Sequence, residues 1–386
     1  MPENRPTKVL IIGAGIGGLT LAVALRRLGM EAVVHERATE LRAAGSGLSV
    51  TSNAMAALDT LGIDLHLAKW GHAVTSFAVR TTRGRLIRRL PLPEIGAELG
   101  VPTVCISRTD LQQALLEAAG DTPIVLGSAA TRVEPDGTVH FEDGTTARGD
   151  VVVGADGFHS VVRRGIVGPE EDLDGGYVCW LGIAPFSHPR LSAGGVIHYW
   201  GSGQRFGLVD IGHGRVYWWG TKNMPPSRSL NWQGDKDEIL SAYSGWAEET
   251  QAAVRATPRE DILAVGSRYR TFQDRWGEGP VTLLGDAAHP MPTSLGQGAA
   301  MAMEDAVVLA RTLAGATDLP AALRTYEDRR RERTRAVVNA SIATSTMEQL
   351  ENPLRRLARD SYLRLVPNRT LLHQQRAALT FPGIPD

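Results

Sequence analysis

Cysteine is nearly absent from this sequence, whose 386 residues include only Cys105 and Cys179. A secreted disulfide scaffold would contain more cysteines, and the spacing of these two fits no metal-binding pattern. We therefore expect two unpaired thiols in a protein of the reducing cytoplasm. The 10 histidines are scattered along the chain, so the sequence predicts no metal site.

Long apolar runs and an excess of either charge are also lacking. No stretch reaches the roughly 18 apolar residues that a membrane-spanning helix needs, so no membrane span is expected. The short polar start, residues 1–8, lacks the apolar core of a signal peptide. Lys and Arg number 41 against 42 for Asp and Glu, which favours neither a nucleic acid nor a membrane surface as partner.

The remaining composition, 43% hydrophobic and 22% charged, is ordinary for a soluble globular enzyme. Strands are expected at residues 8–12, 31–36, 150–153 and 281–284, a hairpin at 133–147, paired strands at 77–90, and an antiparallel sheet in the aromatic-rich segment 177–220. Helices are expected at 19–28, 58–67, 110–119, 232–256 and 305–313, and from 318 to the C-terminus.

Glycines recur in the turn after the first predicted strand, at Gly13, Gly15, Gly17 and Gly18. Gly13 permits a tight turn, Gly15 lets a pyrophosphate approach the backbone, and Gly18 allows the helix to pack closely on the strand. The free N–H groups and the positive end of the helix dipole would then face the phosphates. A glycine motif between a strand and a helix predicts a dinucleotide site; the alternative is a glycine-rich turn without a ligand.

Glu36 ends the second predicted strand, at about the separation expected of a ribose-binding acid. Its carboxylate suits the two hydroxyls of an adenosine ribose and would repel a 2′-phosphate. This site is therefore expected to hold FAD or NAD rather than NADP. Arg37, the next residue, would either stack on adenine or meet a phosphate, or would be a solvated surface arginine.

A second glycine-rich motif follows the strand predicted at 281–284. Asp286 places a carboxylate at the carboxyl end of the sheet, where ligands bind in folds of this kind. This carboxylate is suited to accept hydrogen bonds from sugar-alcohol hydroxyls. Gly296, Gly298 and Ala299 precede a predicted helix, so backbone N–H groups there are expected to face an electron-rich oxygen.

Taken together in chain order, these motifs resemble the class A flavoprotein aromatic hydroxylases, the p-hydroxybenzoate-hydroxylase-like group. The resemblance rests on the Gly13–Gly18 turn, Asp156-Gly157 within Gly-Ala-Asp-Gly, Asp286 with Gly296-Gln-Gly298, Arg108, and the segment Tyr326 to Arg330. It extends from residue 8 to about residue 335. Urate hydroxylases, salicylate hydroxylases and zeaxanthin-epoxidase-like enzymes are all similar in these segments.

The resemblance implies a role in FAD binding for each motif. The Gly13–Gly18 turn and Glu36 would bind the ADP part, Arg108 would lie along the FAD chain, and Asp286 would hold the ribityl. Asp156-Gly157 would serve both FAD and a transient NADH or NADPH.

The amides around Gly298 and Ala299 would stabilise negative charge on the reduced flavin ring. Two departures from the family pattern occur beside them. Thr293 stands where the family usually has the proline of Pro-x-x-Gly-Gln-Gly, with Pro292 one residue early, and Ala300 stands where Asn is frequent. The loop is therefore expected to be shaped differently, while its backbone donors are kept.

The aromatic-rich segment 177–220 is the candidate roof of a substrate pocket, because aromatic walls suit a planar apolar substrate. The alternative is that its Trp and Tyr residues are core or dimer contacts, which is the more frequent role of such residues in a sheet. By alignment, Arg205 and Tyr217 resemble substrate-contacting positions of urate-hydroxylase-like relatives. Arg205 would hold an anionic substrate or would be an ordinary strand residue, and Tyr217 would exchange a hydrogen bond with a phenol.

The predicted fold is α/β, with a Rossmann-like FAD-binding domain, built on a parallel sheet with helices, interleaved with an antiparallel-sheet substrate domain, plus C-terminal helices. The FAD-binding domain is expected to comprise residues 1–72, 100–172 and 262–335, the substrate domain 73–99 and 173–261, and the C-terminal helical segment 336–386.

The implied activity is that of a single-component flavin monooxygenase. It would use NADH or NADPH and O2 to hydroxylate or epoxidise an aromatic or electron-rich small molecule through a flavin hydroperoxide. The alternatives are an FAD-dependent dehydrogenase or reductase without oxygen insertion, and a flavin-binding scaffold without turnover. A monomer or homodimer is expected. No nucleic acid is expected as a partner, because acidic residues interleave with the arginines of the basic segment 324–335.

Overall fold

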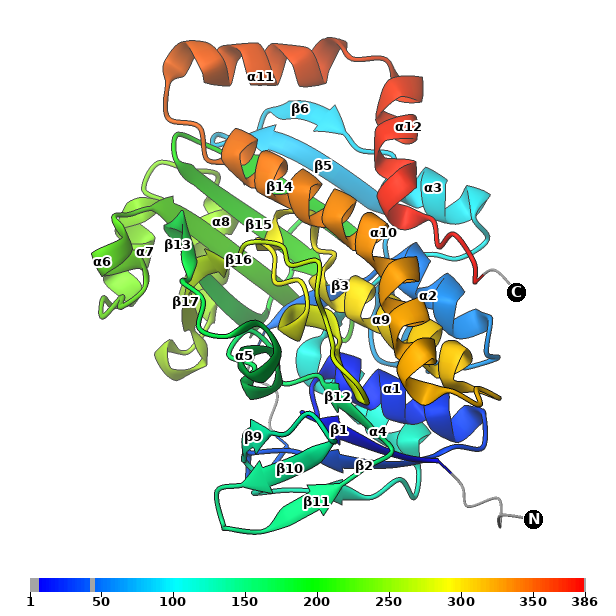
Figure 1. Cartoon of the computed structure of the whole chain (residues 1–386). Helices are drawn as coiled ribbons and strands as arrows, with labels where there is room; N and C mark the ends of the chain where they lie inside the picture. The colour runs from blue at the N-terminus through cyan, green and yellow to red at the C-terminus, as the bar shows by residue number, and fades with distance from the viewer. Residues whose placement is uncertain (1–6, 42–45, 385–386) are drawn as a thin grey trace, which may run out of the picture.

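The computed structural model describes residues 7–41 and 46–384 (Figure 1). The prediction that the chain start is not a signal peptide concerns residues 1–8, and residues 1–6 of these lie outside the described residues. In the described part of the chain, no helix is both long and apolar enough to cross a bilayer.

A parallel sheet forms the first half of the molecule, with the strand order β18-β12-β1-β2-β8. Its strands are β1 (Lys8–Ile12), β2 (Glu31–His35), β8 (Ile124–Val125), β12 (Val151–Gly154) and β18 (Val281–Leu283), and every neighbouring pair is parallel. β12 is buried at every position, as expected of a central parallel strand with both faces covered. The sheet is complete only when segments that are distant in sequence meet.

Helices pack around this sheet, because packing buries their apolar sides away from water. They are α1 (Ile16–Arg27), α2 (Ser52–Asp59), α4 (Arg108–Ala119), α5 (Val161–Val167), α9 (Gly298–Leu313) and α10 (Leu319–Glu348). α1 packs between α4 and α9, and α9 also contacts α2 and α10. Two small antiparallel sheets flank them: β9 (Ala130–Val133), β10 (Thr138–Phe141) and β11 (Thr146–Arg148), and β3 (Gly47–Val50), β4 (His72–Ala73) and β7 (Val104–Ser107).

A seven-stranded sheet forms the second half, in the order β17-β13-β16-β15-β14-β5-β6. Its strands are β5 (Ser76–Thr81), β6 (Leu86–Arg89), β13 (Leu173–Pro185), β14 (Gly195–Trp200), β15 (Gln204–Asp210), β16 (Arg215–Asn223) and β17 (Leu263–Tyr269). All pairs are antiparallel except β14 with β5. β17 pairs with β13, so this sheet continues beyond residue 261.

Shorter helices border the second sheet: α3 (Leu92–Glu98), α6 (Pro226–Ser229), α7 (Lys236–Ala242) and α8 (Glu248–Ala256). One sheet face carries a core of large side chains, including Trp180, Trp218 and Phe206, packed against α7 and α8. In Figure 1, α10 crosses the molecule from the parallel sheet towards the second sheet, and α11 (Pro353–Leu365) and α12 (Asn368–Leu379) follow it.

The predicted α/β fold with two sheet types and C-terminal helices is confirmed, but two helix predictions were wrong. Residues 58–67 are not one helix, because α2 ends at Asp59 and Gly62 has φ +62°. Their leucines are nevertheless buried, which produced the helical spacing. Residues 232–256 form two helices, since Gly245 has φ +75° between α7 and α8.

Candidate functional site

The glycine turn between β1 and α1 is tightly packed on one side and open on the other. A Cβ at Gly18 would lie 2.0 Å from the oxygen of Gly13, and one at Gly13 would lie 2.5 Å from the oxygen of Ala155. A Cβ at Gly15 would meet no atom within 4 Å. The space that a pyrophosphate would need is therefore present at Gly15, next to the N-terminus of α1.

Glu36 bends back over this turn from the end of β2. Its carboxylate accepts hydrogen bonds from the backbone N–H of Ala14, at 2.8 Å, and of Ala38, at 2.9 Å. Both carboxylate oxygens are thus fixed beside the glycine turn, with lone pairs left for further donors. Arg37 is exposed next to it.

Small residues allow α1, α9 and the end of β18 to meet. A Cβ at Gly17 would lie 2.5 Å from Leu284 and 3.2 Å from Ala302. A Cβ at Gly285, where φ is +61°, would lie 2.9 Å from Ala302. This packing brings the glycine turn, the residue after Gly285 and the start of α9 to the same edge of the parallel sheet.

Asp286 lies at that edge and is accessible to solvent although protein surrounds it. Burial raises the pKa of Asp286, while the positive charges of His289 and Arg108 act in the opposite direction. Within the described residues its carboxylate has no hydrogen-bond partner, and a Cβ on Gly298 would lie 3.8 Å from its Oδ1. The Asp286 carboxylate therefore has free acceptor capacity beside the N-terminus of α9.

The loop from Pro292 to Gly298 keeps its backbone donors despite the departure at Thr293. Residues Thr293–Leu295 form one 3-10 turn after Pro292, and Gly296 adopts the left-handed conformation, with φ +62°. α9 then begins at Gly298, followed by Ala299, so the first N–H groups of a long helix face the edge with Asp286. The Pro292 carbonyl accepts a hydrogen bond from Ser341 of α10, at 2.5 Å, which anchors the loop.

The remaining predicted cofactor residues lie at two other edges of the site. Arg108 is exposed at the start of α4, and its charge acts on Asp286. Asp156 follows β12, but its carboxylate accepts hydrogen bonds from Ser160 and from the N–H of Val161, at 2.5 and 2.7 Å. Asp156 thus caps α5, while Gly157, with φ +74°, leaves open space beside it.

One face of the second sheet carries partly exposed side chains, which we call the chamber wall. Buried residues alternate with accessible ones from Leu181 to Pro185 in β13 and from Arg215 to Gly220 in β16, and in β14 every residue except His198 is buried. The partly exposed set is Leu181, Ile183, His198, Tyr217 and Trp219. Because alternate residues of a strand share a face and these positions lie in register across the sheet, they line the same space.

Gly207 shapes this wall by lacking a side chain. It lies between Trp219 and His198 in the sheet, and a Cβ there would lie 2.2 Å from the indole of Trp219. The indole crosses Gly207 and meets the imidazole of His198 edge-on, with ring centroids 4.8 Å apart. Tyr217 in turn packs against Gly47 of β3, which connects the wall to the cofactor edge.

Arg205 adjoins this wall, but its charge is already paired. Its guanidinium forms a buried ion pair with Glu348 of α10 and lies 4.9 Å above the ring of Trp219. Burial raises the pKa of Glu348, and the charge of Arg205 acts in the opposite direction. The substrate sheet and the end of α10 are thereby connected.

His198 and Glu348 are the site residues that the sequence reasoning missed. His198 has no side-chain hydrogen bond among the described residues, and burial and then the charge of Arg205 lower its pKa to about 3. Its imidazole is therefore neutral at physiological pH. No alternating pattern in β14 marks His198, because every other residue of this strand is buried. The pairing of Glu348 depends on a contact 143 residues away.

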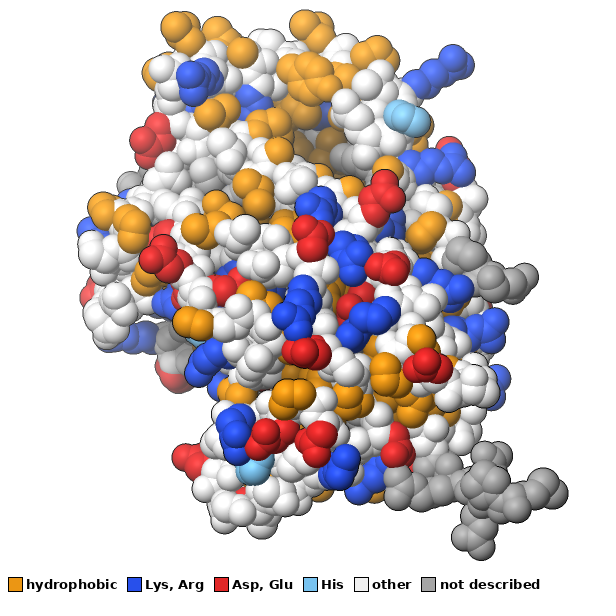
Figure 2. All heavy atoms as spheres, in the orientation of Figure 1, with side chains coloured by type: hydrophobic (Ala, Val, Ile, Leu, Met, Phe, Trp, Pro, Cys, Tyr) orange, Lys and Arg blue, Asp and Glu red, His pale blue; other side chains and the backbone are white. Residues whose placement is uncertain are grey.

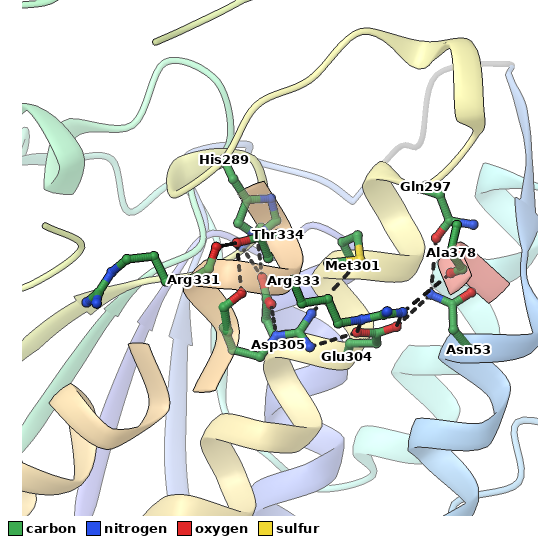
Figure 3. A network of polar contacts seen from close by, with 12 residues as sticks. Asn53, His289, Gln297, Met301, Glu304, Asp305, Arg331, Arg333, Thr334 and Ala378 are labelled. Atoms are coloured by element: carbon green, nitrogen blue, oxygen red, sulfur yellow. Dashed lines mark hydrogen bonds and ion pairs between the residues drawn. The ribbon is translucent and has the colours of Figure 1, made fainter. Parts of the chain in front are cut away.

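Behind the cofactor edge, α9 and α10 share a buried network of charges (Figure 3). Arg330 donates to Glu304 and Asp305, both at 2.7 Å, and Arg333 binds the other side of Glu304. Asp305 also accepts from the N–H of Gly285 and pairs with His289 at 2.6 Å. Burial alone would raise the pKa of Asp305, but His289 and Arg330 lower it to about 2.

The same network reaches the loop before α9. Asn53 of α2 donates to Glu304 at 2.7 Å and to Gln297 at 3.1 Å (Figure 3). Gln297 in turn donates to Thr51. Two acids in an otherwise apolar helix were the visible sequence signal for this network. Both ends of the loop 285–297 are therefore held by groups that have no direct contact with solvent.

Comparisons with known proteins agree with this arrangement. A sequence model described as FAD binding domain matches residues 6–341. Aurachin C monooxygenase/isomerase of Stigmatella aurantiaca is 38% identical over 376 residues, 97% of this chain and 98% of that protein. 3-Amino-4-hydroxybenzoate 2-monooxygenase of Streptomyces cremeus is 35% identical over 342 residues, 86% of each protein.

A solved structure, Klebsiella pneumoniae HpxO complexed with FAD and uric acid, has a TM-score of 0.89 and 28% identity to this chain. The match covers 97% of this chain and 96% of that one. FAD is therefore the cofactor of this fold, as predicted. The open space at Gly15, the unpaired Asp286 carboxylate and the start of α9 fit a dinucleotide that spans this edge of the sheet.

Substitution at two neighbouring glycines should separate folding from cofactor binding. Gly15→Val should leave the apoprotein as stable as the wild type, because no atom lies within 4 Å of the new Cβ, yet weaken FAD binding by about 100-fold or more through its clash with the pyrophosphate. Gly18→Val should lower the melting temperature of the apoprotein, since its Cβ meets backbone. Flavin fluorescence titration and thermal unfolding measure the two effects; equal destabilisation by both variants would contradict the assignment.

Removing Arg330, the central cation of the buried network, should destabilise the folded protein. Arg330→Met leaves Glu304 and Asp305 in the core with reduced compensation, and we expect the free energy of unfolding to fall by about 3–5 kcal/mol. The control is Arg331→Met on the same helix, which removes an ion pair with the largely exposed Asp328 and should cost at most about 1 kcal/mol. Urea unfolding measures both, and similar losses would show that the network contributes little.

Proposed function

This chain belongs to the FAD-dependent aromatic hydroxylase group of flavoprotein monooxygenases, and from that premise we propose how it acts. It takes electrons from NADH or NADPH and uses O2 to hydroxylate or epoxidise a planar aromatic molecule that carries no net charge. The observation that carries this proposal is the single continuous edge from the Gly15 turn through Asp286 and α9 to the aromatic wall.

Residues along this edge would hold FAD. The N-terminus of α1 and the space at Gly15 receive the pyrophosphate, and Glu36 accepts the adenosine ribose hydroxyls. Asp286 accepts hydrogen bonds from the ribityl hydroxyls, which removes the penalty of its desolvated and unpaired carboxylate. Arg108 supplies a positive charge beside the chain. The exposed Arg37 is placed to reach the adenine end.

FAD supplies the redox chemistry when bound, accepting hydride from the nicotinamide and activating O2 for transfer of one oxygen atom. The protein contributes binding, orientation and exclusion of water. The N–H groups at Gly298 and Ala299, at the positive end of α9, stabilise negative charge beside them. The buried contacts of Gln297 and Asp305 keep this loop rigid, so these donors stay oriented.

An uncharged substrate is favoured by the electrostatics of the chamber. Arg205 is compensated by Glu348, so it offers no free positive charge for an anion. His198 stays neutral and keeps both ring nitrogens available, and burial raises the pKa of Tyr217 so that its phenol stays protonated. Trp219 offers an aromatic surface between them. These groups suit a flat ring system that bears a hydroxyl or N–H donor.

The reaction class is tested with the purified protein loaded with FAD. Oxidation of NADH or NADPH should be stimulated by an accepted aromatic compound, and mass spectrometry should find one atom of isotopically labelled O2 in the product. Turnover that is unchanged without O2 would instead assign a dehydrogenase. A protein that no nicotinamide reduces would be a flavin-binding scaffold.

His198 provides a sharper test of the substrate contact. His198→Phe should raise KM for a phenolic substrate by about 10-fold, the value of one hydrogen bond, with a smaller change in kcat. His198→Gln should recover part of the loss, because its amide also bonds. The exposed His373 of α12 serves as control, and His373→Phe should change neither constant. An unchanged KM in His198→Phe would remove this residue from the substrate contact.

A further inference from the structure

Helix α11 exposes large apolar side chains to an unusual degree. Leu354, Leu357 and Leu365 are 77%, 60% and 82% accessible, more than any other large hydrophobic residue in the described ranges, and Tyr362 is 49% accessible. Their spacing places the three leucines on one side of the helix. The opposite side holds Leu363, which is buried where α11 packs on β6. Hydrophobic side chains accordingly gather along the upper edge of the molecule over α11 (Figure 2).

The charge of the same region is strongly positive, although the whole chain is nearly neutral. The segment 353–379 contains six arginines and one acidic residue, Asp360, which pairs with the buried Arg359. Arg355, Arg364 and Arg369 are exposed on or next to α11. An exposed row of leucines bordered by arginines is the pattern of a helix that lies in the interface of an anionic bilayer.

A second copy of the chain fits this face less well. A twofold contact would place the same arginines of both copies near one another, and α11 and α12 contain no free acidic cluster to compensate them. Anionic headgroups supply the missing negative charge, and the acyl region takes the leucines. Charge complementarity therefore selects a lipid surface.

A groove in the protein surface begins beside the N-terminus of α11. Its volume is about 420 Å³, and it extends from Asn352 and Arg355, at the start of α11, to Pro292 and Ser345. Ser345 donates to Tyr177, one turn before Glu348 pairs with Arg205. The groove thus ends against the contacts that close the chamber from outside.

We propose that α11 docks the protein on an anionic lipid surface, with its leucines in the membrane interface. A hydrophobic aromatic substrate would then reach the protein from the bilayer rather than from water. The docking itself does not depend on the proposed reaction, so the two can fail separately.

Vesicle co-sedimentation of the full FAD-loaded chain tests the docking. The protein should sediment with phosphatidylcholine vesicles that contain phosphatidylglycerol, bind pure phosphatidylcholine at least about 10-fold more weakly, and dissociate at high salt. The triple substitution Leu354→Gln, Leu357→Gln, Leu365→Gln should weaken binding by about 100-fold or more, since each buried leucine contributes about 10-fold. Arg355→Gln with Arg364→Gln should reduce the preference for the anionic lipid.

The control is Val265→Gln on β17, which removes another exposed apolar side chain outside α11 and should leave vesicle binding unchanged. Retained flavin absorbance and melting temperature show that each variant is folded. Failure of the wild type to bind anionic vesicles, or equal binding by the triple leucine variant, would overturn the proposal. A dimer in sedimentation velocity that the triple variant loses, without vesicle binding, would assign the face to a second copy.

Discussion

The close approach of α1 and α9 to the end of β18 is the contact on which the site depends. Gly17, Gly285 and Ala302 leave no room for larger side chains where these elements cross. Any other residue there would separate the glycine turn from Asp286 and from the N-terminus of α9. Small residues at this crossing bury little side-chain surface. Their small size lets the N-termini of α1 and α9 and the carboxylate of Asp286 lie along one edge, where they can contact the same FAD.

Buried charges hold this edge from behind, and a second ion pair closes it from the substrate side. Arg330 fixes two acids of α9, and one of them holds the N–H of Gly285. At the far end of α10, Glu348 forms a buried ion pair with Arg205 of the substrate sheet. One helix of 30 residues thus connects the cofactor edge with the chamber wall. Ion pairs of this kind add little net stability but are costly to break, so they favour one arrangement of the loop between them.

Local patterns predicted the individual strands of the parallel sheet and the glycine turn, because each strand and the turn depend on neighbours in sequence. The same patterns predicted one helix at 58–67, where leucines at helical spacing are buried although α2 ends at Asp59 and the chain turns at Gly62. Local sequence patterns could not predict contacts between residues that are distant in the chain. The role of Asp156 as the cap of α5, the pairing of Arg205 with Glu348, and the exposure of His198 to the chamber all depend on which surfaces meet after folding.

The central claim is that segments far apart in the chain bind one FAD together. Hydrogen–deuterium exchange of the apoprotein, with and without FAD, tests it directly at the level of peptides. FAD should slow exchange at once in peptides covering 13–18, 36–38 and 285–299, while the small sheet β9–β11 should be unaffected. Protection confined to the first glycine turn, with none at 285–299, would contradict the account.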